Sequence, residues 1–117
     1  MTATLVILND PPYGTERSYN GLRLATSLAK RAGESVSVFL MGDAAACAKT
    51  GQKVPTGYYN MESMLKVLGR HAARIGACGT CMDARGITEQ ELVEGVHRSS
   101  MDELTTWTVE AGRVITF

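Results

Sequence analysis

The order of apolar segments along the chain predicts an α/β fold in a single domain spanning residues 1–117. Short aliphatic and β-branched runs alternate with longer stretches whose apolar side chains recur at helical spacing. Such alternation is typical of a mostly parallel sheet, here of about five strands, and parallel sheets are buried on both faces. The expected architecture is therefore a three-layer sandwich with helices on both sides of a central sheet.

The first strand is predicted over residues 4–8, a continuous apolar run typical of a strand buried on both faces. Prolines and a glycine make residues 9–14 a loop. Thr15 is then expected to cap a helix, because its hydroxyl suits an N-terminal cap. Helical spacing of leucine and alanine continues to about residue 32, and Gly33 is the expected stop.

A second apolar strand is predicted over residues 36–41, with Asp43 capping a short helix over residues 44–49. Two glycines and a proline make residues 50–59 a loop that is long enough to suggest that it covers a site. Asn60 is the expected cap of the next helix, which ends near residue 72.

The third strand is predicted over residues 74–77 and is followed by the two cysteines. A helix is expected from Thr88 to Gly95, because Thr88 and Glu91 fit a capping box. A short strand over residues 96–98, a helix over 101–111 and a last strand over 114–117 complete the pattern.

Charge and composition argue against several classes of function. Twelve acidic and twelve basic side chains cancel, so no global field favours nucleic acid or an anionic membrane. No apolar run approaches the roughly 18 residues of a membrane span, and the first eight residues do not resemble a signal peptide. Glycine-rich nucleotide motifs are absent from the sequence, so no cofactor is expected. Three cysteines are unlike a secreted disulfide framework, and a cytoplasmic location is expected.

Candidate site residues follow the predicted strands, because ligands of an open α/β sheet bind outside the carboxyl ends of its strands. They are Asn9, Asp10 and Tyr13 after the first strand, Gly42 and Asp43 after the second, and Cys78, Gly79, Cys81 and Arg85 after the third. The two aspartates are equally typical of turns and caps. Asp83 and Arg85 are equally well explained as a surface ion pair.

Cys78 is the expected nucleophile because it directly follows a strand. Gly79 permits close approach of the backbone, and Arg85 is the expected cation beside the thiolate. Cys47, in an alanine-rich segment, is expected in the core.

The pair of thiols in Cys78-Gly79-Thr80-Cys81 is compatible with three kinds of chemistry. A zinc site needs four ligands, and no second pair has suitable spacing, so a metal site within one chain is disfavoured, although one shared between subunits stays open. Thioredoxin-like chemistry is disfavoured because all three prolines precede the motif and a long helix starting at the cysteines is not expected. In the third reading, a thiolate of low pKa carries sulfur as a persulfide.

Three segments of the sequence resemble the DsrE/DsrF-like family, in its small YchN-like branch. They are Leu5-Val6-Ile7-Leu8-Asn9-Asp10-Pro11-Pro12-Tyr13-Gly14, Phe39-Leu40-Met41-Gly42-Asp43-Ala44, and Gly76-Ala77-Cys78-Gly79-Thr80-Cys81-Met82-Asp83-Ala84-Arg85-Gly86-Ile87. The most specific of these features is Cys-Gly-Thr-Cys followed by Ala-Arg-Gly. The resemblance extends over essentially the whole chain.

The resemblance implies an α/β fold with a central parallel sheet, assembled as homotrimers or hexamers. It also implies sulfur transfer, since related members such as TusD and DsrE relay persulfide sulfur between proteins. Their active cysteine precedes the glycine of an Arg-Gly pair by eight residues, a position that corresponds to Cys78, counting back from Gly86. Cys81 is an addition relative to those carriers.

Two functions therefore follow as expectations. The first is a persulfide carrier, sulfurtransferase-like if active, with Cys78 as acceptor, Cys81 as auxiliary thiol, and sulfur donor and acceptor proteins as partners. The alternative is an oligomeric small-molecule-binding or redox-switch protein that uses the Cys78/Cys81 pair.

Overall fold

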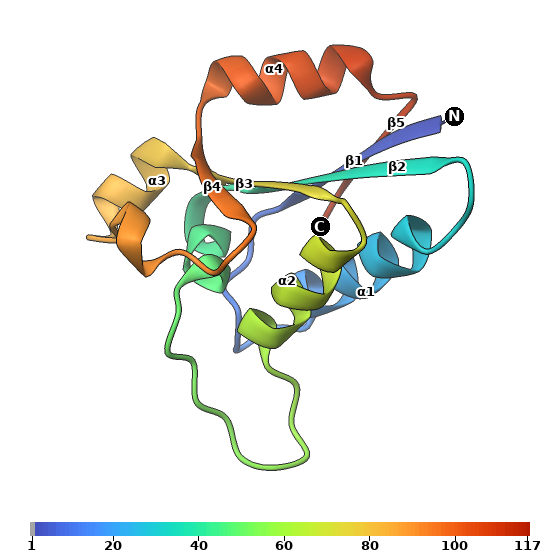
Figure 1. The fold of residues 1–117 in the computed structure, drawn as a ribbon. Helices are drawn as coiled ribbons and strands as arrows, with labels where there is room; N and C mark the ends of the chain where they lie inside the picture. The colour runs from blue at the N-terminus through green and yellow to red at the C-terminus, as the bar shows by residue number, and fades with distance from the viewer. Residues whose placement is uncertain (1) are drawn as a thin grey trace.

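The structure, a computed structural model that describes residues 2–117, contains a five-stranded parallel sheet with helices on both faces (Figure 1). The predicted fold class is confirmed. The strands lie in the order β4-β3-β2-β1-β5. Their bounds are Thr2–Leu8 (β1), Glu34–Leu40 (β2), Arg74–Cys78 (β3), Val96–Ser99 (β4) and Arg113–Thr116 (β5).

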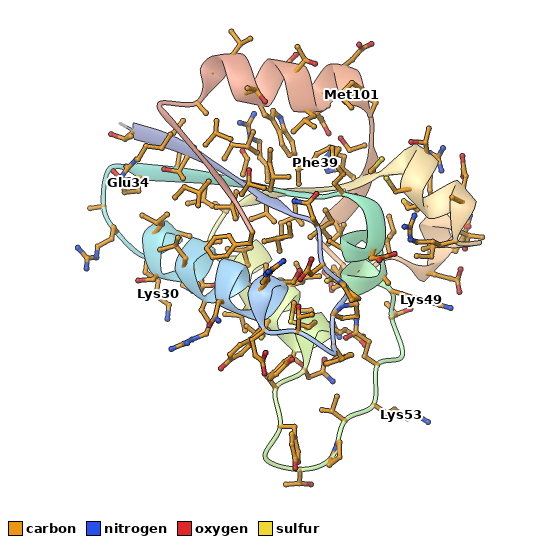
Figure 2. The ribbon with its side chains drawn as sticks, turned by 180° about the vertical axis from the view of Figure 1, so that it is seen from behind. Lys30, Glu34, Phe39, Lys49, Lys53 and Met101 are labelled. Carbon is orange, nitrogen blue, oxygen red and sulfur yellow. The ribbon has the colours of Figure 1, made fainter. Side chains whose placement is uncertain are left out.

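Alternation of side chains along the strands divides the core into two layers. Helices α1 (Arg17–Ala29) and α2 (Met61–Arg70) cover one face, where they pack against Val6 and Val38. Helix α4 (Met101–Glu110) covers the other face, where Leu104 and Trp107 pack against Leu5 and Phe39. Figure 2 shows Phe39 between the sheet and α4. The side chains of the adjacent residues Leu5 and Val6 therefore pack in opposite layers, because successive side chains of a strand point to opposite faces of the sheet.

Three short helical segments connect the strands, and they differ from the expectations. Residues Gly42–Ala48 form a 3-10 helix (η1), and Asp43 lies in its first turn without capping it. Residues Gly79–Ala84 form a six-residue α-helix (α3), where only a loop was expected. The expected helix over residues 88–95 is wrong beyond one 3-10 turn, Glu89–Glu91 (η2).

The reason for the short η2 is a competing backbone pairing. The Thr50 amide donates to the Glu91 carbonyl at 2.8 Å, and the Val93 amide donates to the Ala48 carbonyl at 2.8 Å. This antiparallel bridge draws residues 91–93 out of helical geometry. The half of the capping box in which the Thr88 amide donates to the Glu91 carboxylate, at 2.9 Å, is nevertheless present.

The cap predicted for the first helix is displaced by one residue. Helix α1 begins after Glu16, which makes no side-chain cap. The Thr15 hydroxyl donates to Asp10 at 2.8 Å and accepts from the Arg17 amide at 3.4 Å, so its side chain joins the preceding loop to the start of the helix. Asn60 and Ser100 do cap α2 and α4, since each side chain accepts an amide hydrogen bond from the first turn.

The loop over residues 50–59 extends away from the body of the molecule, with Lys53 near its outer part (Figures 1 and 2). It does not lie over the cysteines. Its base is anchored by Gln52, whose side chain donates to the Cys47 carbonyl at 2.8 Å and accepts from the Tyr13 hydroxyl at 2.6 Å. Within the described chain, no helix is both long and apolar enough to span a bilayer.

Gly76 in β3 is a test of the packing beneath α4. A Cβ at this position would lie 2.9 Å from the Ser99 Cβ and 3.2 Å from the Trp107 ring. We expect Gly76→Ala to lower the free energy of unfolding by about 1–3 kcal/mol, because the packed layer cannot accommodate a methyl group without strain. Urea denaturation measures this change.

Gly69→Ala is the matched control. No atom lies within 4 Å of a Cβ built on Gly69, which is in helix α2. Alanine has a higher helix propensity than glycine, so this variant should gain up to about 1 kcal/mol. Equal unfolding midpoints for Gly76→Ala and the unsubstituted protein would contradict the packing argument.

Candidate functional site at the carboxyl end of β3

Cys78 lies where strand β3 becomes helix α3. It is the last residue of the strand and the N-cap of the helix, and its sulfur accepts from the Cys81 amide at 3.4 Å. The Thr80 hydroxyl lies 3.4 Å from the same sulfur. Only 8% of the Cys78 surface is exposed. Strand β3 thus places the Cys78 thiol at the end of the sheet, and the first turn of α3 surrounds it with hydrogen-bond donors.

These contacts favour the thiolate of Cys78. Burial opposes ionisation, but hydrogen bonds from the side chains and amides of Cys81 and Thr80 outweigh it and lower the pKa of Cys78 below its ordinary value. Hydrogen bonds to a sulfur stabilise its charged form more than its neutral form. The site can therefore present a nucleophilic sulfur at a lower pH than a free cysteine.

Cys81 is held differently. Its sulfur accepts a hydrogen bond from the Gly42 amide at 3.2 Å, which joins η1 to α3. Burial is the main factor that raises the pKa of Cys81, and the neighbouring Cys78 sulfur adds to it. The two thiols are thus unequal, with Cys78 the ionisable one and Cys81 the one that keeps its proton.

Arg85 does not take the position beside Cys78 that the sequence indicated. Its guanidinium donates to the Asp43 carboxylate at 2.8 Å and to the Cys81 carbonyl at 3.0 Å. Its charge acts on Cys81, where it partly offsets the rise in pKa. The predicted surface pair of Asp83 with Arg85 is also wrong, because each has another partner.

Arg98 of strand β4 is the cation that sequence reasoning missed. It makes a bidentate pair with Asp83, at 2.8 and 2.9 Å, and lines the same pocket as Cys78. The parallel register sets Cys78 opposite Ser99, which brings Arg98 beside the start of α3. Only knowledge that β4 neighbours β3 could have identified Arg98, and the order of strands is not written in the sequence.

The pocket at Cys78 has a volume of about 270 Å³ and opens between the sheet, α3 and the start of α4. Its apolar wall is formed by Phe39 and Met101, and its polar wall by Thr80, Arg98 and Ser100. Met101 is 63% exposed and lies at the first turn of α4 (Figure 2). A Cβ on Gly79 would lie 2.9 Å from the Arg98 guanidinium, so a side chain there would displace the end of Arg98.

Asn9, Asp10 and Tyr13, the candidates after β1, make contacts within their own part of the fold. The Asn9 amide side chain donates to the Phe117 carbonyl at 3.1 Å, which closes the sheet end between β1 and β5. Asp10 accepts from Thr15, and Tyr13 donates to Gln52. None of the three lines the Cys78 pocket as described.

Gly42 and Asp43 do join the cysteine segment. Gly42 has a left-handed φ of 60°, which favours glycine and turns its amide toward Cys81. Asp43 holds Arg85.

The remaining thiol, Cys47, is fully buried, and burial raises its pKa to about 12. Among residues 2–117, no three His, Cys, Asp or Glu side chains gather closely enough to hold a metal ion. The site can therefore be described by two thiols and the backbone and charges around them.

Comparison with known proteins gives a consistent result. A family model described as "DsrE/DsrF-like family" matches residues 3–117. The chain is 37% identical to protein YchN of Escherichia coli K12 over 118 residues, which cover 100% of both chains. It is 38% identical to an uncharacterized protein of Methanopyrus kandleri over 113 residues, 96% of this chain and 91% of that one.

Solved structures agree with these relatives. The crystal structure of the ychN protein from E. coli superposes with a TM-score of 0.94 at 37% identity, covering 100% of both chains. A protein of unknown function from Methanobacterium thermoautotrophicum gives a TM-score of 0.74 at 15% identity, over 99% and 98% of the two chains. The second likeness is one of fold alone.

Thr80 offers a direct test of the hydrogen bonds at Cys78. We expect Thr80→Val to raise the pKa of Cys78, because the thiolate loses the hydroxyl at 3.4 Å. A higher pKa leaves less thiolate at a given pH, so the pH midpoint of Cys78 alkylation should move to higher pH. Mass spectrometry of iodoacetamide-treated peptides measures it.

Thr106→Val is the control, since that hydroxyl bonds to the Asp102 carbonyl within α4. It should leave the Cys78 midpoint unchanged. A midpoint that does not move in Thr80→Val would show that the hydroxyl does not stabilise the thiolate.

Proposed function

The chain belongs to the DsrE/DsrF-like family, and on that premise we propose that it is a cytoplasmic persulfide carrier. Cys78 is the acceptor of the sulfane sulfur, and a donor protein and an acceptor protein are its partners. The observation that carries the proposal is the inequality of the two thiols. Cys78 has a lowered pKa at the edge of a pocket, whereas the pKa of Cys81 is raised. A cytoplasmic location suits this chemistry because thiols stay reduced there.

The proposed loading step needs no external oxidant. The Cys78 thiolate attacks the terminal sulfur of a donor persulfide, a new S–S bond forms at Cys78, and the donor's own S–S bond breaks. The bonding electron pair leaves with the donor as a thiolate. Unloading is the same exchange in reverse, with an acceptor thiolate as nucleophile. Electrons balance because the sulfane sulfur is transferred at a constant oxidation level.

Cys81 has a defined role in this scheme. Its thiol keeps its proton and lies within hydrogen-bonding contact of Cys78, so it can donate to the thiolate or to a persulfide. If no acceptor arrives, Cys81 can lose its proton and attack the inner sulfur of the persulfide. A Cys78–Cys81 disulfide then forms, the S–S bond of the persulfide breaks, and the outer sulfur leaves as hydrosulfide, which takes up the proton. Cys81 would therefore limit the lifetime of the loaded state.

The close contact of the two thiols also supports the alternative function, a redox switch in an oligomeric binding protein. The Cys81 amide lies 3.4 Å from the Cys78 sulfur, and both side chains belong to one turn. In this alternative the pair cycles between dithiol and disulfide and does not accept sulfane sulfur.

Sulfur loading distinguishes the two functions. After incubation with a low-molecular-weight persulfide and removal of excess donor, the intact protein should gain the mass of one sulfur atom. Cys78→Ser should gain none. Cys81→Ser should gain the same mass and retain it longer, because the resolving thiol is absent.

Cys47→Ser is the matched control, since Cys47 is buried and its raised pKa keeps it protonated. Loading of Cys78→Ser would contradict the assignment of the acceptor. A protein that ignores every sulfur donor but forms a reversible disulfide would favour the redox switch.

We also propose that the protein assembles as a homo-oligomer, a trimer or hexamer. Large apolar side chains are exposed on two sides of the sheet: Val109 is 80% exposed and Met101 63% exposed on α4, and Tyr58 is 71% exposed beside α2. Exposed apolar surface of this kind favours association. Light scattering at micromolar concentration should give a mass several times that of one chain, and a monomer would contradict the proposal.

A further inference from the structure

Arg98 is placed to act on Cys78 although the two residues come from different strands. Both line the same pocket of about 270 Å³, and the parallel register of β3 and β4 pairs Arg98 with Ala77, the residue before Cys78, near the carboxyl end of the sheet. The guanidinium carbon Cζ, Nε and one terminal nitrogen all lie 2.9 Å from the position of a Cβ on Gly79. The flat group therefore packs directly against the backbone that follows Cys78.

Asp83 determines the orientation of this guanidinium. Its two carboxylate oxygens accept hydrogen bonds from the terminal nitrogens Nη1 and Nη2, at 2.8 and 2.9 Å. Among residues 2–117, the hydrogen bonds of the Arg98 side chain are those of its two terminal nitrogens with Asp83. A bidentate pair of this kind fixes the plane of the guanidinium, which a lysine could not reproduce.

The charges around the pocket do not cancel evenly. The Asp83 side chain is 62% exposed and that of Arg98 35% exposed, so water screens the carboxylate more than the guanidinium. Glu89 also acts on Arg98, from the exposed outer side. The second ion pair near the motif, Arg85 with Asp43, lies on the Cys81 side. Among the residues that line the Cys78 pocket, Arg98 is the charged one, and neither Asp83 nor Arg85 is in the lining.

We propose that Arg98 makes the Cys78 pocket selective for small anions, and that a small anionic sulfane compound can load Cys78 in addition to a donor protein. The donor class rests on the proposed function; the selectivity of the pocket does not. The volume of the pocket suits a compound of a few heavy atoms, and its polar wall of Thr80, Arg98 and Ser100 can offer hydrogen-bond donors and a positive charge. Phe39 and Met101 supply an apolar wall for a polarisable sulfur atom.

For thiosulfate, used as a probe of this class, the step balances without an oxidant. The Cys78 thiolate attacks the outer, sulfane sulfur, and an S–S bond forms at Cys78. The S–S bond of thiosulfate breaks, and its electron pair leaves with sulfite. Arg98 faces the negative charge of the arriving donor and of the departing sulfite, which makes it a positioning residue for both.

The selectivity is tested with two alkylating agents of similar size and different charge. We measure the rate of Cys78 modification by anionic iodoacetate and by neutral iodoacetamide, and take the ratio of the two. In Arg98→Gln the ratio should fall about fivefold, since two unit charges about 4 Å apart in water interact by roughly that factor. Because the ratio compares two reagents on one thiol, a change in the pKa of Cys78 leaves it unaffected.

Matched variants locate the effect. Arg98→Lys keeps the charge and should keep most of the ratio, and Arg85→Gln should leave it unchanged because Arg85 lies on the Cys81 side and does not line the Cys78 pocket. Asp83→Asn removes the compensating carboxylate and should raise the ratio, which gives a second test if Arg98→Gln does not fold. A ratio that is unchanged in Arg98→Gln, or that falls in Asp83→Asn or in Arg85→Gln instead, would overturn the proposal.

The donor class is tested separately by loading with thiosulfate. The unsubstituted protein should gain one sulfur atom, and Arg98→Gln should load roughly thirtyfold more slowly, because thiosulfate carries two negative charges where iodoacetate carries one. Equal loading rates would overturn the role of Arg98. If persulfides load Cys78 and thiosulfate does not, the donor class is wrong. If no donor loads it, the proposed function fails, whereas the alkylation ratio still decides whether Arg98 selects anions.

Discussion

The pairing of β3 between β2 and β4 is the constraint on which the whole site depends. Register with β2 places Ala77 opposite Leu40, which brings the Gly42 amide to the Cys81 sulfur. Register with β4 places Cys78 opposite Ser99, which brings Arg98 over Gly79. Backbone hydrogen bonds of the sheet therefore position a thiol, an amide donor and a cation from three different segments, and their relative positions are as rigid as the sheet.

The chemistry of the site follows from the close approach of the backbone to the two cysteine sulfurs. Gly79 lies against Arg98, and Gly42 has a left-handed backbone, so neither position accepts an ordinary side chain without displacement. Close backbone approach lets amides reach both sulfurs. The same amide-rich surroundings act unequally on the two thiols, because Cys78 accepts more hydrogen bonds and Cys81 has a sulfur neighbour that opposes its ionisation. Two identical side chains thereby acquire different roles.

Much of the architecture could be predicted because it depends on local rules. Apolar runs gave the strands, and Asn60 and Ser100 marked helix starts through caps that involve only neighbouring residues. The clearest failure occurs where a distant segment competes with a local preference. The helix expected after Thr88 gives way to pairing with residues 48–50. Long-range hydrogen bonds won there, and local pattern contains no information about them.

The sequence by itself determined that this is a parallel α/β domain and that Cys78, directly after a strand, is the thiol to consider first. It also nominated Gly42 and Asp43, which follow the second predicted strand, and Arg85, which follows the cysteines, as candidate site residues. Only the tertiary structure decided that Arg85 bonds to the Cys81 carbonyl whereas Arg98 lines the Cys78 pocket. It also decided that Asn9, Asp10 and Tyr13 lie outside that pocket. The physical reason is that strand order and register, which are set by the packing of the entire sheet, decide which charges are neighbours.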